Sequence, residues 1–316
     1  MGGSYYDNSR VPHFFALKNM NEENEIPKSV EKKYVLPVSI VIATIILAGA
    51  LVYTAGRTHP EDKAPQSTAT VTVGTGGAVL SVRWGDLGAQ MVREGVIDKT
   101  QFEALYASRG GLSPDMEAML NGSDNGQIKL TPQNPSVILN LLWAFGLGNK
   151  NPILENGPMK NPQYGGAGNF ASTGGWTLSE GSAMNHYSAH SFVTLTADQQ
   201  ALVEEVSKNI YRPCCGNSTY FPDCNHGMAM LGLLELMASQ GATEDQMYKT
   251  ALIANSYWFP NEYQTMARYL AAKGVDWNSV DPKDVLAANF SSAQGYGQIL
   301  QAVQPVPNNS GNSCGA

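Results

Sequence analysis

The sequence PCCGNSTYFPDCNHGMAMLGLLELMASQG, residues 213–241, decides the fold and carries the most specific motif of the chain. A cysteine-rich segment leads into a long apolar run that ends at Gln240. Asp223 is a good N-cap and Gly241 a good terminator, so the run predicts a helix over residues 224–240. The cysteines and a histidine would then lie at the start of this helix.

Helix signals recur on both sides of this segment. Two capping boxes and two pairs of a capping residue followed by proline mark helix starts at Ser113, Thr196, Thr243 and Asp281. Apolar periodicity predicts further helices over residues 136–145 and 262–273. The only strand signal is an alternation over residues 71–82, around Gly74–Gly77, which predicts at most one small β-hairpin. We therefore expect a mostly α fold, with a single helical domain over residues 71–316.

A glycine-rich segment, residues 157–181, has neither a helical nor a strand period and contains seven glycines. Its aromatic residues Tyr164, Phe170 and Trp176 favour an ordered loop that packs on the core. The segment has no P-loop lysine and no G-x-G-x-x-G between a strand and a helix, so no nucleotide is expected.

An uncharged segment of 23 residues, 34–56, precedes the domain and is bounded by Lys32, Lys33 and Arg57. This length covers the roughly 30 Å hydrocarbon core of a bilayer, so the segment predicts a single transmembrane helix. The lysines place the N-terminus in the cytoplasm. The prediction is thus a single-pass cell-membrane protein, with the lipid bilayer as a partner and the main domain extracytoplasmic.

The regions around this segment complete the expected organisation. Residues 1–33, with mixed charge and few aliphatic side chains, predict a disordered cytoplasmic tail, and residues 57–70 predict a linker. Cleavage after Ala50, as in a signal peptide, stays open as an alternative.

The charge of the chain excludes one class of partner. Only 15% of the 316 residues are charged and the net charge is −7, so no basic surface is expected to neutralise phosphates. Nucleic acid is not an expected partner. The sequence does not indicate a protein partner.

The cysteines allow three interpretations. Four cysteines on the oxidising side of a membrane can form two disulfides, Cys215–Cys224 and Cys214–Cys314, in an interaction domain without catalysis. Alternatively, the thiolates of Cys214, Cys215 and Cys224 can bind a soft metal ion such as copper or zinc. A thiol-dependent redox enzyme is the third interpretation, although the chain has no C-x-x-C motif.

The metal interpretation includes the histidines. His226 follows Cys224 by two residues, and His186 with His190 has the i, i+4 spacing of a helical metal-binding pair. Cys224 and His226 point about 200° apart on a regular helix, so they can share an ion only if Cys224 precedes the helix. Met228 and Met230 are further soft donors nearby.

Geometry and electrostatics add two expectations. Adjacent side chains of an extended segment point to opposite sides, so Cys214 and Cys215 are not expected to share a partner. A helix start stabilises a thiolate, so Cys224 is expected to be the most acidic thiol. No C-x-x-C-H motif is present, so no c-type haem is expected.

The sequence thus predicts a membrane-anchored extracytoplasmic protein that binds copper or zinc through Cys214, Cys215, Cys224 and His226. His186 and His190 are candidate additional ligands.

Overall fold

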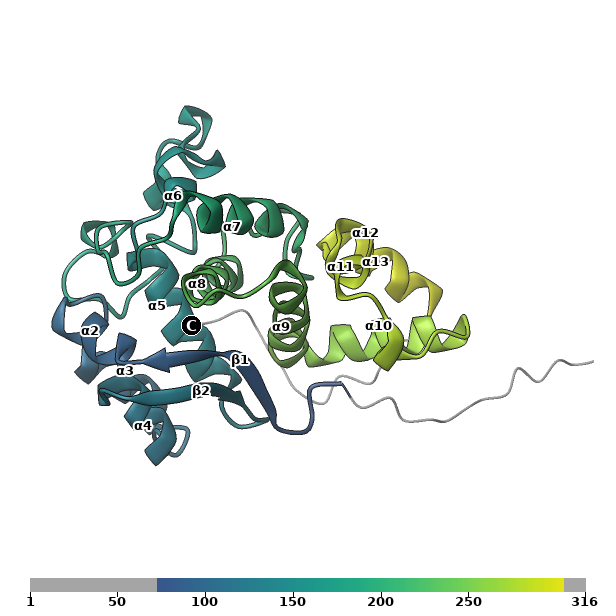
Figure 1. Cartoon of the computed structure of the whole chain (residues 1–316), viewed down its shortest axis with the longest axis horizontal. Helices are drawn as coiled ribbons and strands as arrows, with labels where there is room; N and C mark the ends of the chain where they lie inside the picture. Colours follow the sequence, from purple (N-terminus) through teal and green to yellow (C-terminus); the bar gives the residue numbers. More distant parts are fainter. Residues whose placement is uncertain (1–72, 304–316) are drawn as a thin grey trace, which may run out of the picture. The chain divides into compact units, whose positions relative to one another are not determined.

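The computed structural model of the chain describes residues 73–303, and these residues are mostly helical with a two-stranded sheet (Figure 1). Helix α8 (Asn225–Ser239) lies at the centre, with α5 (Pro135–Gly148), α7 (Ala197–Asn209) and α9 (Glu244–Trp258) packed against it. The other α-helices are α2 (Leu87–Arg93), α3 (Lys99–Ala107), α4 (Pro114–Asn121), α6 (Pro152–Asn156), α10 (Pro260–Ala272), α11 (Pro282–Leu286), α12 (Ala288–Ser291) and α13 (Ala293–Ala302).

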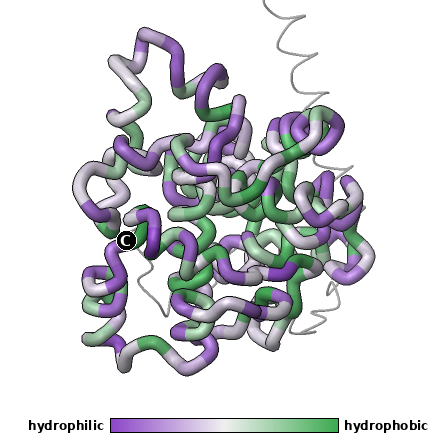
Figure 2. The backbone as a smooth tube through the Cα atoms, turned by 60° about the vertical axis from the view of Figure 1, so that its left-hand side comes forward, coloured by the Kyte–Doolittle hydropathy of each residue, from purple (hydrophilic) through white to green (hydrophobic). Residues whose placement is uncertain are grey.

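Helices α5 and α8 form the centre of the core. Every residue of α8 except Ser239 is buried, and so is every residue of α5 except its first two. Their backbones meet at Gly146 and Gly232, where a Cβ on either glycine would collide with the backbone of the other helix. Figure 2 shows the hydrophobic segments gathered in the interior of this part of the chain. Burial of these apolar surfaces is the main force that holds α8 in place.

The sheet differs from the predicted hairpin. Strands β1 (Ala78–Gly85) and β2 (Asn125–Leu130) pair antiparallel, with Ala78 opposite Leu130, but α2, α3 and α4 lie between them in the chain. Residue Gly74 precedes β1 instead of turning between two strands; its φ of +70° and its contact with the Ser256 backbone explain the glycine there. The hairpin prediction was wrong because the partner strand lies far along the sequence.

The predicted helix starts are largely confirmed. Thr196 and Thr243 each form a complete capping box, and Ser113 and Asp281 cap helices that begin with proline. The central helix differs in one respect, because its N-cap is Cys224 and not Asp223. Asp223 is instead engaged by an arginine, which is described below.

The predicted transmembrane helix requires a correction. A span needs about 20 consecutive apolar residues. Within residues 73–303, no helix is both long and apolar enough to cross a bilayer, and α8 and α9 have 15 residues each. The predicted segment, residues 34–56, lies outside the described residues, as do the predicted tail and linker, residues 1–33 and 57–70. The structure therefore does not support the single-pass anchor, the bilayer as a partner or the cell-membrane localisation.

Candidate metal centre

The cysteines lie on a loop that connects α7 to α8. Both the amide N and the Oγ1 of Thr219 donate to the carbonyl oxygen of Ile210, at 2.8 and 3.1 Å, and so close the base of the loop. Next to Ile210, the amide of Tyr211 donates to the carbonyl of Leu286 and holds the loop against α11. The loop is thus tied to the helical core on either side of the cysteines.

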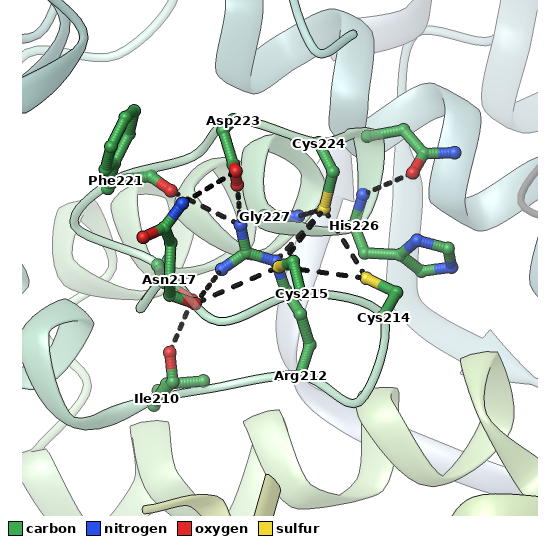
Figure 3. Close-up of polar contacts among 12 residues, drawn as sticks. Ile210, Arg212, Cys214, Cys215, Asn217, Phe221, Asp223, Cys224, His226 and Gly227 are labelled. Atoms are coloured by element: carbon green, nitrogen blue, oxygen red, sulfur yellow. Dashed lines mark hydrogen bonds and ion pairs between the residues drawn. The ribbon is translucent and has the colours of Figure 1, made fainter. Parts of the chain in front are cut away.

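Arg212 organises the interior of this loop. Its side chain is 1% exposed, and all its hydrogen bonds go to loop residues (Figure 3). The Nε atom donates to Cys224 Sγ at 3.1 Å, and Nη1 donates to the carbonyl of Asn217 at 2.9 Å. The Nη2 atom donates to the carbonyl of Phe221 and forms a 2.6 Å ion pair with Asp223. A buried guanidinium bonded in this way fixes the positions of both a carboxylate and a thiol.

Sequence patterns do not single out this arginine. It lies two residues before the first cysteine, where no spacing rule singles it out. The glycine at position 227 is related to it, since a Cβ there would collide with the guanidinium of Arg212. The glycine between His226 and Met228 therefore leaves the space that the side chain of Arg212 occupies.

Three sulfur atoms form a triangle beside this guanidinium (Figure 3). The Sγ–Sγ distances are 3.6 Å for Cys214–Cys224, 3.9 Å for Cys214–Cys215 and 4.0 Å for Cys215–Cys224. A disulfide requires about 2.05 Å. The predicted Cys215–Cys224 disulfide is therefore wrong, and the three thiols are free. Cys314, the partner in the other predicted disulfide, lies outside the described residues.

The expectation that Cys214 and Cys215 point apart was also wrong. It assumed an extended backbone, whereas the chain turns here and the amide of Cys215 donates to the carbonyl of Arg212 at 3.3 Å. Cys224 and His226 were expected to share an ion only if Cys224 precedes the helix, and it does. This residue is the N-cap, with extended φ and ψ of −121° and 166°, and so it precedes the first helical turn.

His226 completes the cluster. Its ligand atom and the sulfurs of Cys214 and Cys224 all lie within 4.8 Å of one another. A second group, Cys215, Asp223 and Cys224, meets the same limit. His226 is buried, its ring lies 4.4 Å from that of Phe259, and its Nδ1 atom has no hydrogen-bond partner within the described part of the chain. This Cys/His cluster could hold a metal ion.

The three thiols differ in acidity. Hydrogen bonds from Cys214 and Cys215, together with the charge of Arg212, hold the pKa of Cys224 well below its ordinary value. A hydrogen bond with Cys214 lowers the pKa of Cys215, but the bond to Cys224 and burial outweigh it and raise this pKa to about 12. Hydrogen bonds to the other two sulfurs raise the pKa of Cys214. Cys224 is therefore the thiol that ionises first, as the sequence indicated.

His186 and His190 lie elsewhere, and neither belongs to the groups of described residues that could share an ion. Nδ1 of His186 and Nε2 of His190 are 3.1 Å apart, and Nε2 of His186 is 3.1 Å from the carbonyl oxygen of Glu180. Because that carbonyl only accepts, Nε2 of His186 carries the hydrogen, and Nδ1 accepts from His190.

The ring geometry of this pair is that of a hydrogen bond. The ring planes are 20° apart and the ring centroids are 5.3 Å apart, close to the separation of the two nitrogens plus the two ring radii. The facing nitrogens thus point at each other and do not converge on a third point. Nδ1 of His190 lies 3.9 Å from a carboxylate oxygen of Glu94, the C-cap of α2.

The glycine-rich segment packs on the cysteine loop. Its rings Tyr164 and Phe170 form a trio with Phe221 of the loop, with all three centroid separations equal to 5.4 Å. The amide of Ser172 donates to the carbonyl of Asp223 at 3.2 Å. The segment consists of short 3-10 turns, and Trp176 is buried, as expected for an ordered loop.

Comparison with known proteins gave no relative from which a role could be transferred. No protein-family model, no curated protein and no solved structure matches this chain. The chemistry of the site therefore has to be argued from its own residues.

Proposed function

We propose that this protein binds one soft metal ion through the thiolates of Cys214, Cys215 and Cys224, with His226 as the fourth ligand. The observation that carries the proposal is the sulfur triangle. Zinc–sulfur bonds of about 2.3 Å at tetrahedral angles place two sulfurs about 3.8 Å apart. The three observed separations, 3.6, 3.9 and 4.0 Å, lie on both sides of this value.

The kind of ion follows from the donors. Thiolates select zinc, copper(I) and iron–sulfur clusters, and imidazole suits zinc and copper. Three thiolates and one imidazole carry three negative charges, of which a divalent ion neutralises two. The guanidinium of Arg212, 3.1 Å from Cys224, compensates a further charge, although it is shared with Asp223. Zinc is thus the first ion to test and copper(I) the second.

Metal analysis of the purified full chain tests the proposal. We expect about one equivalent of zinc or copper after dialysis, and loss of this ion in Cys215→Ser and in Cys224→Ser, because each variant removes a charged soft donor. His226→Ala should weaken retention. His190→Ala is the matched control and should retain the ion. The His190 ring lies outside the cysteine cluster and is hydrogen-bonded to His186, which in turn donates to the carbonyl of Glu180. Equal metal content in the wild type and both cysteine variants would contradict the proposal.

A second candidate, thiol-dependent chemistry at Cys224, has one observation in its favour. The sulfur accepts from the guanidinium of Arg212 at 3.1 Å and from the amide of Gly227 at 3.4 Å, which is the setting of a stabilised thiolate. This candidate predicts a metal-free protein with one rapidly reacting thiol. The metal analysis and a free-thiol count separate the two.

A further inference from the structure

The three sulfurs of the cluster differ in the contacts behind them. Cys224 Sγ accepts from Arg212 and from the amide of Gly227, and its own residue starts α8. Cys215 is held by its backbone, because its amide donates to Arg212 and its carbonyl accepts from the amide of Ala293 at 2.9 Å.

Cys214 has neither kind of support. Within the described residues, the hydrogen-bond contacts of its sulfur are the other two sulfurs. It is also the exposed cysteine of the three, whereas Cys215 and Cys224 are half-buried. Among the proposed ligands, exposure therefore decreases from Cys214 to the buried His226.

Hydrogen bonds to a thiolate lower its reactivity. An N–H donor stabilises the negative charge on sulfur, and a more stabilised thiolate is a weaker nucleophile. When a metal ion holds all three thiols as thiolates, protonation no longer ranks them. Donor contacts and access to solvent then decide which sulfur reacts, and both favour Cys214 over Cys224.

We propose that Cys214 is the reactive thiolate of the metal-loaded centre, at which soft alkylating electrophiles are captured, and that Cys224 is the anchoring ligand. This inference rests on the proposed metal binding. In the reaction, an electron pair of Cys214 Sγ forms a carbon–sulfur bond, the bond from that carbon to its leaving group breaks, and the group departs with the bonding electrons. The neutral thioether that results is a weaker ligand, so the ion is left on Cys215, Cys224 and His226.

The test uses the zinc-loaded full chain with Cys314→Ser, so that only the three clustered cysteines compete. Its zinc content is measured first, one equivalent of iodoacetamide is added, and peptide mass spectrometry locates the label. We expect at least about tenfold more label on Cys214 than on Cys215 or Cys224. Adding Cys214→Ser to the same chain should slow labelling of the zinc-loaded protein by about tenfold or more.

The outcomes separate this inference from the proposal beneath it. A chain that retains about one zinc but is labelled first on Cys215 or Cys224, or equally on all three, overturns the role of Cys214 and leaves the metal site intact. A chain that retains neither zinc nor copper overturns both. Cys215→Ser serves as the matched variant, since it also removes one ligand. Both variants are labelled with zinc kept in excess, so that loss of the ion does not decide the result. If Cys215→Ser slows labelling as much as Cys214→Ser, the assignment to Cys214 fails.

Discussion

The pKa values of the ionisable side chains at the two ends of α8 are shifted in opposite directions. At its N-terminal end, the pKa of Cys224 is held well below its ordinary value by the neighbouring thiols and by Arg212. Three turns further along, burial raises the pKa of Glu235 well above its ordinary value, and a hydrogen bond from Asn149 opposes this only in part. At Cys224 the hydrogen bonds of two thiols and the charge of Arg212 together outweigh burial, whereas at Glu235 burial outweighs the hydrogen bonding of uncharged amide groups.

The two ends of α8 also differ in their access to solvent, and this difference suits the Cys224 end to binding a ligand. Glu235 is fully buried, and its oxygen accepts from the uncharged amide of Asn149 at 2.6 Å. The Cys224 end opens to solvent through Cys214. A carboxyl that is fully buried beside an uncharged amide is suited to joining α8 to the end of α5, whereas a sulfur cluster that reaches solvent is suited to binding a ligand.

Removing the charge of Arg212 should have the largest effect on the free energy of unfolding. Arg212→Met leaves Asp223 and the Cys224 thiolate without their buried partner, and we expect a loss of about 3–5 kcal/mol in the free energy of unfolding. Urea unfolding of the metal-free protein measures it. Arg212→Lys keeps the charge but cannot replace all four hydrogen bonds of the guanidinium, so we expect a loss smaller than that of Arg212→Met. A loss below about 1 kcal/mol in Arg212→Met would show that the guanidinium does not hold the loop.

The opposite end of α8 offers the next largest effect. A folded-state pKa above the unfolded value means that Glu235 stabilises the fold below the unfolded pKa and loses this contribution as pH rises toward the folded pKa. The slope is at most about 1.4 kcal/mol per pH unit. Glu235→Gln keeps the shape and an acceptor for Asn149 but does not titrate, so at pH 8 it should be about 1–3 kcal/mol more stable than the wild type.

The control for this prediction is Glu205→Gln, on the exposed face of α7. Its pH profile of unfolding free energy, measured in urea between pH 4 and 8, should follow that of the wild type. If Glu235→Gln follows it too, the carboxyl at position 235 is ionised in the folded protein, and the contrast between the two ends of α8 does not hold.

Part of this arrangement was predictable from sequence because it depends on local signals. Caps such as Thr196 and Thr243 act within one turn, and the place of Cys224 at a helix start follows from the apolar run that begins there. These features need no knowledge of distant residues. The acidity of Cys224 could be predicted for the same reason, although the sequence indicated only one of its causes.

The remaining features depend on contacts that sequence spacing does not contain. Arg212 acquires its role from a loop that folds back on it, and the turn there brings Cys214 and Cys215 together against the expectation for an extended chain. The strands that pair are separated by three helices. The i, i+4 spacing of His186 and His190 predicted a metal-binding pair on a helix, but the chain forms a turn there and the two rings are hydrogen-bonded to each other.

His190 sharpens the comparison at a partly exposed ring, where burial, a neighbouring histidine and a carboxylate act together and the smallest effect is expected. Burial lowers its pKa, the neighbouring His186 lowers it further, and the carboxylate of Glu94 partly opposes both. For a histidine with a lowered folded pKa, the unfolded chain takes up the proton at a higher pH than the folded protein does. The free energy of unfolding therefore falls as pH drops below the unfolded pKa of about 6.5.

His190→Gln removes this titration while its amide can still donate to Nδ1 of His186. The variant should lose less stability than the wild type between pH 7 and pH 5, with a difference below about 1 kcal/mol because the ring is partly exposed. Glu94→Gln is the matched variant with the opposite sign: without the carboxylate the pKa of His190 falls further, so the loss on acidification should be larger than in the wild type. Urea unfolding at the two pH values measures all three proteins. A steeper loss in His190→Gln would mean that the fold stabilises the proton on His190, and that Glu94 outweighs burial there. A shallower loss in Glu94→Gln would mean that this carboxylate does not stabilise the protonated ring.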